Sequence, residues 1–144
     1  MKPLPHHYEV RLSGGSEGYA KASAEGLPDL ACAAPVDFDG PGDAWSPEHM
    51  LLSSVSACFL LTLRTVAKLS KFQFKGLEMA AEGTLDRKDG AMRFTDILLR
   101  PRLTVAPGTD RAQALRMMEK AEKACLISAS LSTPVRLQAE VVEA

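Results

Sequence analysis

The sequence has few aromatic residues, almost no net charge and only three cysteines. Aromatic side chains make up 6% of the 144 residues, and the formal net charge is −1. A nearly neutral chain lacks the electrostatic signature of a protein that binds nucleic acid or an anionic membrane surface. Cys32, Cys58 and Cys125 form no CxxC pair, and no histidine stands near them at metal-ligand spacing. We therefore expect free thiols, no zinc site and no nucleic-acid partner.

Long apolar runs are missing as well. The N-terminal stretch MKPLPHHYEV has no apolar core of the kind found in secretory signals. The longest apolar stretch, Met50–Leu63, is interrupted by four hydroxyl residues and is shorter than the roughly 20 residues that cross a bilayer. These features predict a cytoplasmic protein with no membrane partner, folded as a single domain over residues 1–144.

Alternating and helical apolar periodicities predict an α+β fold. A long helix is expected to begin at the N-cap Ser46 and to end near Ser70, and a second helix to run from Asp110 to Cys125. Between them, residues 86–90 should form a hairpin turn, and Pro101 should occupy a sheet edge or a bulge. The element order is βββ-α-ββ-α-β, which favours mainly antiparallel sheet. The strands are expected at Tyr8–Leu12, Tyr19–Ala24, Leu27–Ala33, Leu77–Leu85, Met92–Val105 and Val135–Val141, with a loop at Pro35–Asp43.

The first half of the long helix has no charge on any face from Met50 to Leu61. A helix that is apolar all round is expected to be buried all round. A chain of this length supplies too little sheet to cover such a helix, so a second subunit is the natural source of the missing surface. The helix therefore predicts a homodimer.

The cysteines are the residues best able to carry chemistry. Cys58 lies inside the apolar helix, where it is either a small core residue or a reactive thiol. Cys125 ends the second helix, where it either fills the core stripe of the helix or takes part in thiol chemistry. The helix dipole there raises a thiol pKa, so it suits a resolving thiol better than an attacking one. Cys32 is interpreted as structural. Glu48 precedes Cys58 by ten residues, about 15 Å along one helix, so it either serves the helix start or acts on the thiol of a partner subunit.

The segment Ser46–Phe59 resembles the signature of the OsmC/Ohr family. That signature is a Pro-Glu pair opening a long helix, followed by small residues and by Ala-Cys, which here are Pro47, Glu48, Ala57 and Cys58. Lys120–Ser128 is similar to the second cysteine segment of the family. The resemblance implies an intertwined homodimer in which sheets from both chains wrap around long buried central helices, with the sites at the interface.

The resemblance also implies an activity. Characterised members reduce organic hydroperoxides, which makes Cys58 the peroxidatic thiolate, Cys125 the resolving thiol and Glu48 an orienting carboxylate. An external dithiol, of the lipoyl type in relatives, would reduce the disulfide again. No metal and no bound cofactor are implied. The apolar substrate is expected to contact Met50, Leu51, Phe59 and Met118.

The sequence departs from the family pattern at the arginine that stabilises the thiolate. One subgroup carries this arginine at the position of Ser16, and the other carries it in the loop near Phe38. Neither place has a basic residue in this sequence. Arg11 and Arg64 are the candidates to replace it. Cys125 is also followed by Leu126-Ile127, where relatives usually have proline and an aromatic or small residue. Two other functions therefore stay open beside the peroxidase: a non-catalytic dimer that binds an apolar ligand, and a thiol redox sensor.

Overall fold

The computed structural model describes all residues, 1–144, and they form two compact units, Met1–Met50 and Leu51–Ala144. The expectation of one domain over the whole chain stays a prediction.

The N-terminal unit contains a small antiparallel sheet in the order β1-β2-β3. Its strands are β1 (Arg11–Ser13), β2 (Ala20–Ser23) and β3 (Leu30–Cys32). All three strands were predicted and are shorter than expected. The predicted loop follows, and it contains a 3-10 turn, η1 (Val36–Phe38). The chain then returns beside β3, where the N–H of Ala33 donates to the carbonyl of Trp45.

The long helix α1 (Pro47–Leu69) begins where the capping signal predicts. The Ser46 hydroxyl is fully buried and accepts a hydrogen bond from the N–H of His49 at 3.1 Å, which satisfies one of the free N–H groups of the first turn. In the C-terminal unit, one stripe of α1 at four-residue spacing is buried: Val55, Phe59, Leu63 and Ala67. The helix therefore packs in this chain through one face only.

The C-terminal unit is built on a long hairpin of β4 (Gly76–Lys88) and β5 (Ala91–Val105). Its connection is shorter than predicted, because the strands pair up to Lys88 and Ala91 and leave only two residues in the loop. Those residues, Asp89 (φ 54°) and Gly90 (φ 80°), have the paired positive φ angles of the tight turn that matches strand twist.

The C-terminal strand prediction needs a correction, since the segment forms two strands. β6 (Val135–Leu137) and β7 (Glu140–Glu143) both pair with β5 in parallel. Pro101 is correspondingly not at a sheet edge: it lies buried in the central strand β5, opposite the break between β6 and β7. Proline has no N–H to donate, so a central position is tolerated where the neighbouring ladder is interrupted.

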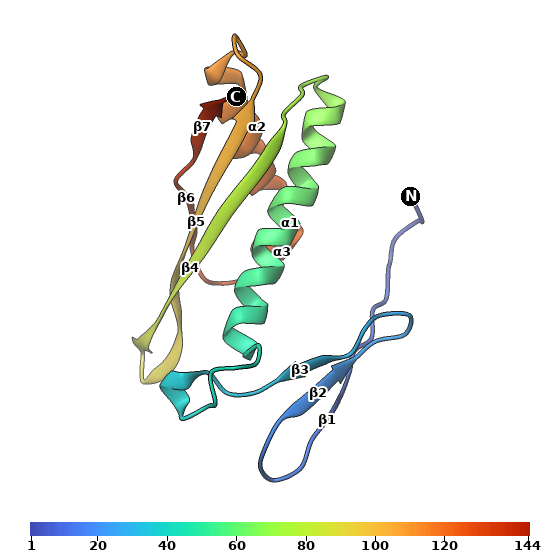
Figure 1. The fold of residues 1–144 in the computed structure, drawn as a ribbon, viewed down its shortest axis with the longest axis vertical. Coiled ribbons are helices and arrows are strands. Elements are labelled where there is room, and N and C mark those ends of the chain that lie inside the picture. The colour runs from blue at the N-terminus through green and yellow to red at the C-terminus, as the bar shows by residue number, and fades with distance from the viewer. The chain divides into compact units, whose positions relative to one another are not determined.

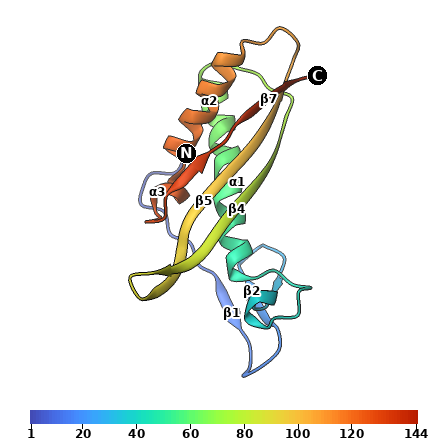
Figure 2. The same cartoon turned by 90° about the vertical axis from the view of Figure 1, so that its left-hand side faces the viewer.

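Two helices follow the hairpin, α2 (Arg111–Ala124) and the short α3 (Leu126–Ala129), of which α3 was not predicted. Helices α1 and α2 pack on the same face of the β4–β7 sheet (Figures 1 and 2). The core between them contains alternate residues of β5 and apolar side chains of both helices: Ile97, Leu99, Leu103, Phe59, Leu63, Ala114, Met118 and Ala121.

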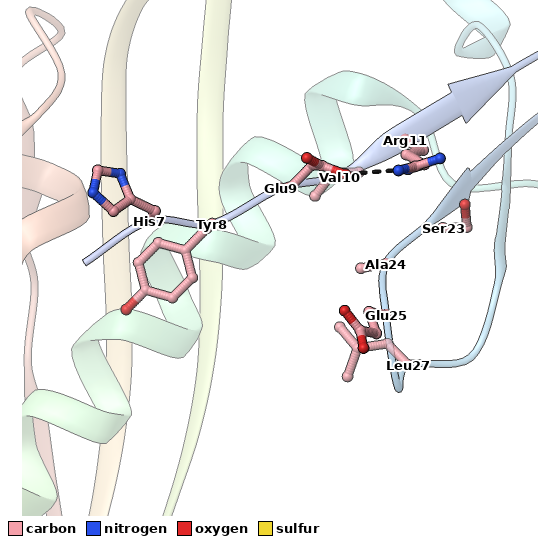
Figure 3. Close-up of a pocket in the computed structure, with 9 residues that line it drawn as sticks. All are labelled: His7, Tyr8, Glu9, Val10, Arg11, Ser23, Ala24, Glu25 and Leu27. Atoms are coloured by element: carbon pink, nitrogen blue, oxygen red, sulfur yellow. Dashed lines mark hydrogen bonds and ion pairs between the residues drawn. The ribbon is translucent and has the colours of Figure 1, made fainter. Parts of the chain in front are cut away.

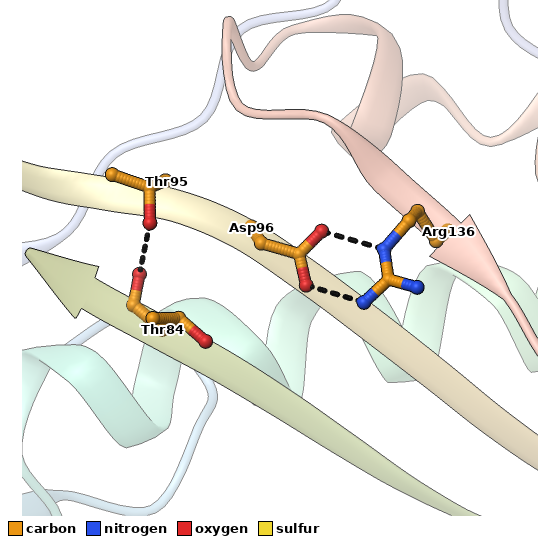
Figure 4. A network of polar contacts seen from close by, with 4 residues as sticks. All are labelled: Thr84, Thr95, Asp96 and Arg136. Atoms are coloured by element: carbon orange, nitrogen blue, oxygen red, sulfur yellow. Dashed lines mark hydrogen bonds and ion pairs between the residues drawn. The ribbon is translucent and has the colours of Figure 1, made fainter.

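The other face of this sheet is polar. Arg136 of β6 forms a two-pronged ion pair with Asp96 of β5 at 2.7 and 2.8 Å, and the Thr95 hydroxyl donates to the Thr84 carbonyl across the hairpin (Figure 4). The guanidinium hydrogen bonds hold the pKa of Asp96 below its usual value. Such exposed, mutually paired charges are typical of a solvated sheet face.

The start of α2 offers a test of this local structure. Asp110 accepts hydrogen bonds from the N–H groups of Ala112 (3.0 Å) and Gln113 (3.2 Å). We expect Asp110→Ala to lower the free energy of unfolding by about 1 kcal/mol, the usual cost of an N-cap. Asp110→Asn, which keeps the acceptor, should cost much less. Urea denaturation of the three proteins measures both values, and an unchanged free energy of unfolding in Asp110→Ala would show that the cap contributes nothing.

Most of α1 is uncovered in the single chain. By length and composition α1 is the one helix that could cross a membrane, and 22% of its most apolar window is buried. Its buried face, however, contributes to a mixed core with β5 and α2, as a helix of a globular domain does. The remaining apolar faces of α1 are exposed, and the second subunit of the predicted dimer would bury them.

Candidate thiol site

Cys58 lies near the middle of α1 and is partly buried. Its sulfur is 3.8 Å from the hydroxyl of Thr62, one helical turn further along. Cys58 directly precedes Phe59, a member of the buried stripe, so the helix holds the thiol at the border between the core and the uncovered surface.

Cys125 joins α2 to α3 and is 1% exposed. Its thiol lies close enough to that of Cys58 for each to shift the pKa of the other, and both are free thiols. The helix α2, packed on the sheet beside α1, brings together two cysteines that are far apart in the sequence. The structure thus places in one site the two thiols that the sequence singled out.

The Cys58 thiol lies among hydrogen-bond donors. Burial by itself raises its pKa, but contacts with Cys125, the N–H of Ile127, the Thr62 hydroxyl and the N–H of Leu126 together outweigh burial and lower the pKa below its ordinary value. Donors that favour the charged form act in this direction. A larger share of Cys58 is therefore thiolate near neutral pH than for a free cysteine, and the thiolate is the nucleophilic form.

Cys125 behaves in the opposite way. Burial raises its pKa, and so does the interaction with Cys58, whereas the hydroxyl and the N–H of Ser128 lower it without reversing the shift. The sequence predicted this direction from the helix dipole, but the causes in the structure are burial and the neighbouring thiol. At rest, Cys58 is the better nucleophile and Cys125 the protonated donor.

No arginine of the C-terminal unit acts on the Cys58 thiol. Arg11 forms an exposed ion pair with Glu9 at 3.1 Å, beside a surface hollow of about 850 Å³ in the N-terminal unit (Figure 3). Arg64 is exposed on α1. The donors that stabilise the thiolate are instead the N–H groups at the beginning of α3 and the hydroxyl of Thr62.

Glu48 lies in the N-terminal unit, at the start of α1. It borders an apolar hollow of about 450 Å³ together with Leu12, Cys32 and Phe38. Its Oε2 atom is buried and has no hydrogen-bond partner. A buried carboxylate oxygen without a donor is unfavourable, so the position is incomplete in the isolated chain.

The residues predicted to contact a substrate fall into two groups. Met50 and Leu51 are partly buried and keep accessible surface. Phe59 and Met118 are fully buried in the core of the C-terminal unit and offer no surface to a ligand in this chain. Their role in binding stays a prediction. In this chain they pack in the core between the two helices that carry the thiols.

Sequence reasoning missed the donors around the thiols. Thr62 follows Cys58 by four residues, a spacing that places both on one side of a helix, so its contact had a visible signal. The N–H groups of Leu126 and Ile127 had none, because the four-residue helix α3 has no side-chain cap hydrogen bond and no periodicity to mark it. No group of three His, Cys, Asp or Glu side chains is close enough to hold a metal ion.

Known proteins are similar in sequence to this chain over most of its length. Residues 40–140 match the family model described as OsmC-like protein. The chain is 28% identical over 139 residues to the uncharacterised protein YmaD of Bacillus subtilis, covering 94% of this chain and 93% of that one. It is 29% identical over 117 residues to an organic hydroperoxide resistance protein of Xanthomonas axonopodis, covering 78% of each.

Solved structures share the fold. An OsmC-like protein of unknown function from Vibrio cholerae superimposes with a TM-score of 0.85 at 17% identity, over 94% of this chain and 99% of that one. An organic hydroperoxide resistance protein from Elizabethkingia anophelis gives a TM-score of 0.78 at 21% identity over the whole of both chains. The family match spans more than half of the sequence and includes both cysteine segments. The chain therefore belongs to the OsmC-like protein family.

Proposed function

We propose that this protein is a cysteine-based peroxidase that reduces organic hydroperoxides in the cytoplasm. The observation that carries the proposal is the pair of neighbouring free thiols, one with a lowered and one with a raised pKa. Relatives named organic hydroperoxide resistance protein and Peroxiredoxin OsmC support the same chemistry at the level of the family.

The reaction follows from the two thiols. The Cys58 thiolate attacks the outer oxygen of the hydroperoxide, the O–O bond breaks, and Cys58 becomes a sulfenic acid while the alkoxide takes up a proton to leave as an alcohol. Cys125 then loses its proton and attacks the Cys58 sulfur, so that an S–S bond forms and the sulfenic oxygen leaves as water. An external dithiol, of the lipoyl type by analogy with relatives, reduces the disulfide and is itself oxidised to a disulfide.

The substrate we propose is apolar. Leu126, whose N–H acts on the Cys58 thiol, is 68% exposed although it directly follows the buried Cys125. Partly buried Leu51 lies two helical turns before Cys58 on the same side of α1. Apolar side chains near the thiols favour an alkyl or aryl hydroperoxide over hydrogen peroxide.

A homodimer is part of the proposal. The uncovered faces of α1 and the unpartnered oxygen of Glu48 support a second copy that covers the helix and lets Glu48 act in the partner's site. This arrangement would also explain why Glu48 and Cys58, which stand ten residues apart on one unbroken helix, belong to one family signature.

Stopped-flow oxidation of the reduced protein tests the function. We expect rapid oxidation by cumene hydroperoxide, slower oxidation by hydrogen peroxide, and many turnovers when a dithiol is supplied. Reversible oxidation without turnover would instead favour a redox sensor. Inert thiols together with measurable binding of an apolar ligand would favour the non-catalytic dimer.

The thiolate donors make a prediction of their own. Thr62→Val removes a hydroxyl that lowers the pKa of Cys58, so the pKa should rise and less thiolate should be present at any pH below it. The pH profile of Cys58 alkylation, measured in a Cys32→Ala, Cys125→Ala background, should move to higher pH. Thr65→Val is the control, because the Thr65 hydroxyl donates to the Leu61 carbonyl and not to a sulfur. Identical profiles for the two variants would remove Thr62 from the site.

A further inference from the structure

The hydroxyl of Ser128 is buried and has no hydrogen-bond partner. Among the side-chain nitrogen and oxygen atoms of the chain, only Glu48 Oε2 shares this state. Buried polar atoms are nearly always paired, so each exception asks for an explanation. For Ser128 the explanation lies beside it, at the candidate thiol site.

A neighbouring serine shows what the ordinary alternative would be. Two residues later on the same segment, the Ser130 hydroxyl donates to the Leu126 carbonyl at 2.7 Å, the usual bond of a helical serine to its own backbone. Ser128 makes no such bond. The polar group that its hydroxyl does influence is the thiol of Cys125, three residues earlier, whose pKa it lowers although the hydroxyl itself has no hydrogen-bond partner.

The charge on the Cys125 sulfur changes during a redox cycle, and a hydrogen-bond donor stabilises only its negative form. In the resting protein the pKa of Cys125 is raised by burial and by Cys58, the one titratable group that acts on it, so the thiol keeps its proton. When Cys58 has been oxidised, that negative partner is gone, and Cys125 must lose its proton while 1% exposed. Ser128 then supplies the donors that remain, its hydroxyl and its N–H.

We propose that Ser128 activates Cys125 for the resolving step, its hydroxyl donating a hydrogen bond to the Cys125 sulfur as that thiol becomes a thiolate and attacks the oxidised Cys58. The inference rests on the proposed pairing of Cys58 with Cys125, but not on the identity of the oxidant. The proposed role explains why the hydroxyl has no partner in the resting protein. The donor is positioned before the negative charge that it stabilises is formed on the Cys125 sulfur.

An aromatic disulfide such as dithiobis(nitrobenzoate) separates the two thiols without any peroxide. The Cys58 thiolate attacks it, forms a mixed disulfide and releases a first coloured thiolate. Cys125 then attacks the Cys58 sulfur, forms the internal disulfide and releases a second. In a Cys32→Ala background, we expect Ser128→Ala to slow the second release about tenfold, the effect of losing one hydrogen bond to a charged group, and to leave the first unchanged.

The pH profile of the second release separates activation from simple structural support. In Ser128→Ala it should move to higher pH, while Ser128→Thr, which keeps a hydroxyl, should restore the rate and the profile. Ser130→Ala is the matched control and should leave both phases unchanged. A second release at the normal rate in Ser128→Ala, or an equal slowing of both phases, would overturn the inference.

The same variants distinguish this inference from the proposed function. If cumene hydroperoxide fails to oxidise Cys58 in the unsubstituted protein, the peroxidase proposal fails. If the second thiolate release is still slowed by Ser128→Ala in that case, the role of Ser128 stands as part of another thiol chemistry.

Discussion

Replacing Cys58 by serine should abolish the dithiol-dependent reduction of cumene hydroperoxide, with a loss of at least roughly a thousandfold in kcat/KM. The O–O bond is broken by attack of the sulfur, and the pKa of that sulfur is lowered by the donors around it. A serine hydroxyl in the same place is not ionised near neutral pH and cannot accept the oxygen to form a sulfenic acid. A coupled assay of dithiol consumption measures the loss.

The other two cysteines provide the controls. Cys32→Ala should keep normal turnover, since Cys32 is buried in the sheet of the N-terminal unit. Cys125→Ser should still consume one equivalent of hydroperoxide per chain and then stop with Cys58 as a sulfenic acid, which a dimedone adduct would reveal by mass. Full turnover in Cys58→Ser would contradict the proposed role of Cys58.

Much of the fold was readable because its signals are local. Ser46 and Pro47 mark the start of α1, and Asp89-Gly90 marks the hairpin turn, since each depends on a few neighbouring residues. The position of Pro101 was predicted wrongly, because a proline is tolerated in the central strand β5 only where β6 ends and β7 has not yet begun. That gap is a property of the assembled sheet and has no sign near residue 101 in the sequence.

In the candidate site, too, the local features could be predicted and those that depend on the assembled fold could not. Cys58 and Cys125 were identified by their segments, but their contact depends on how α2 packs beside α1. The arginine of the family pattern is missing from both of its usual places, at Ser16 and near Phe38. The donors found instead belong largely to the backbone of α3, and a backbone N–H is present at every residue except proline, so composition cannot reveal which ones face a sulfur.

Leu61 connects the fold to the proposed dimer. It is 56% exposed, and it lies on α1 where residues such as Ser53, Ser54 and Ala57 leave the helix surface uncharged and uncovered. In a monomer, Leu61→Glu would replace an exposed apolar side chain by a charged one, which costs little. In a dimer that buries this face, the same substitution places a charge without a partner in an apolar interface.

We therefore expect Leu61→Glu to raise the dimer dissociation constant at least about a hundredfold and to lower the Tm in a concentration-dependent way. Analytical ultracentrifugation measures the first effect and differential scanning calorimetry the second. Lys120→Glu, at an exposed position of α2, is the control and should change neither. A Leu61→Glu dimer as tight as the original would place α1 outside the interface. Since Glu48 is proposed to serve the partner's thiol, peroxidase activity should fall together with the dimer fraction.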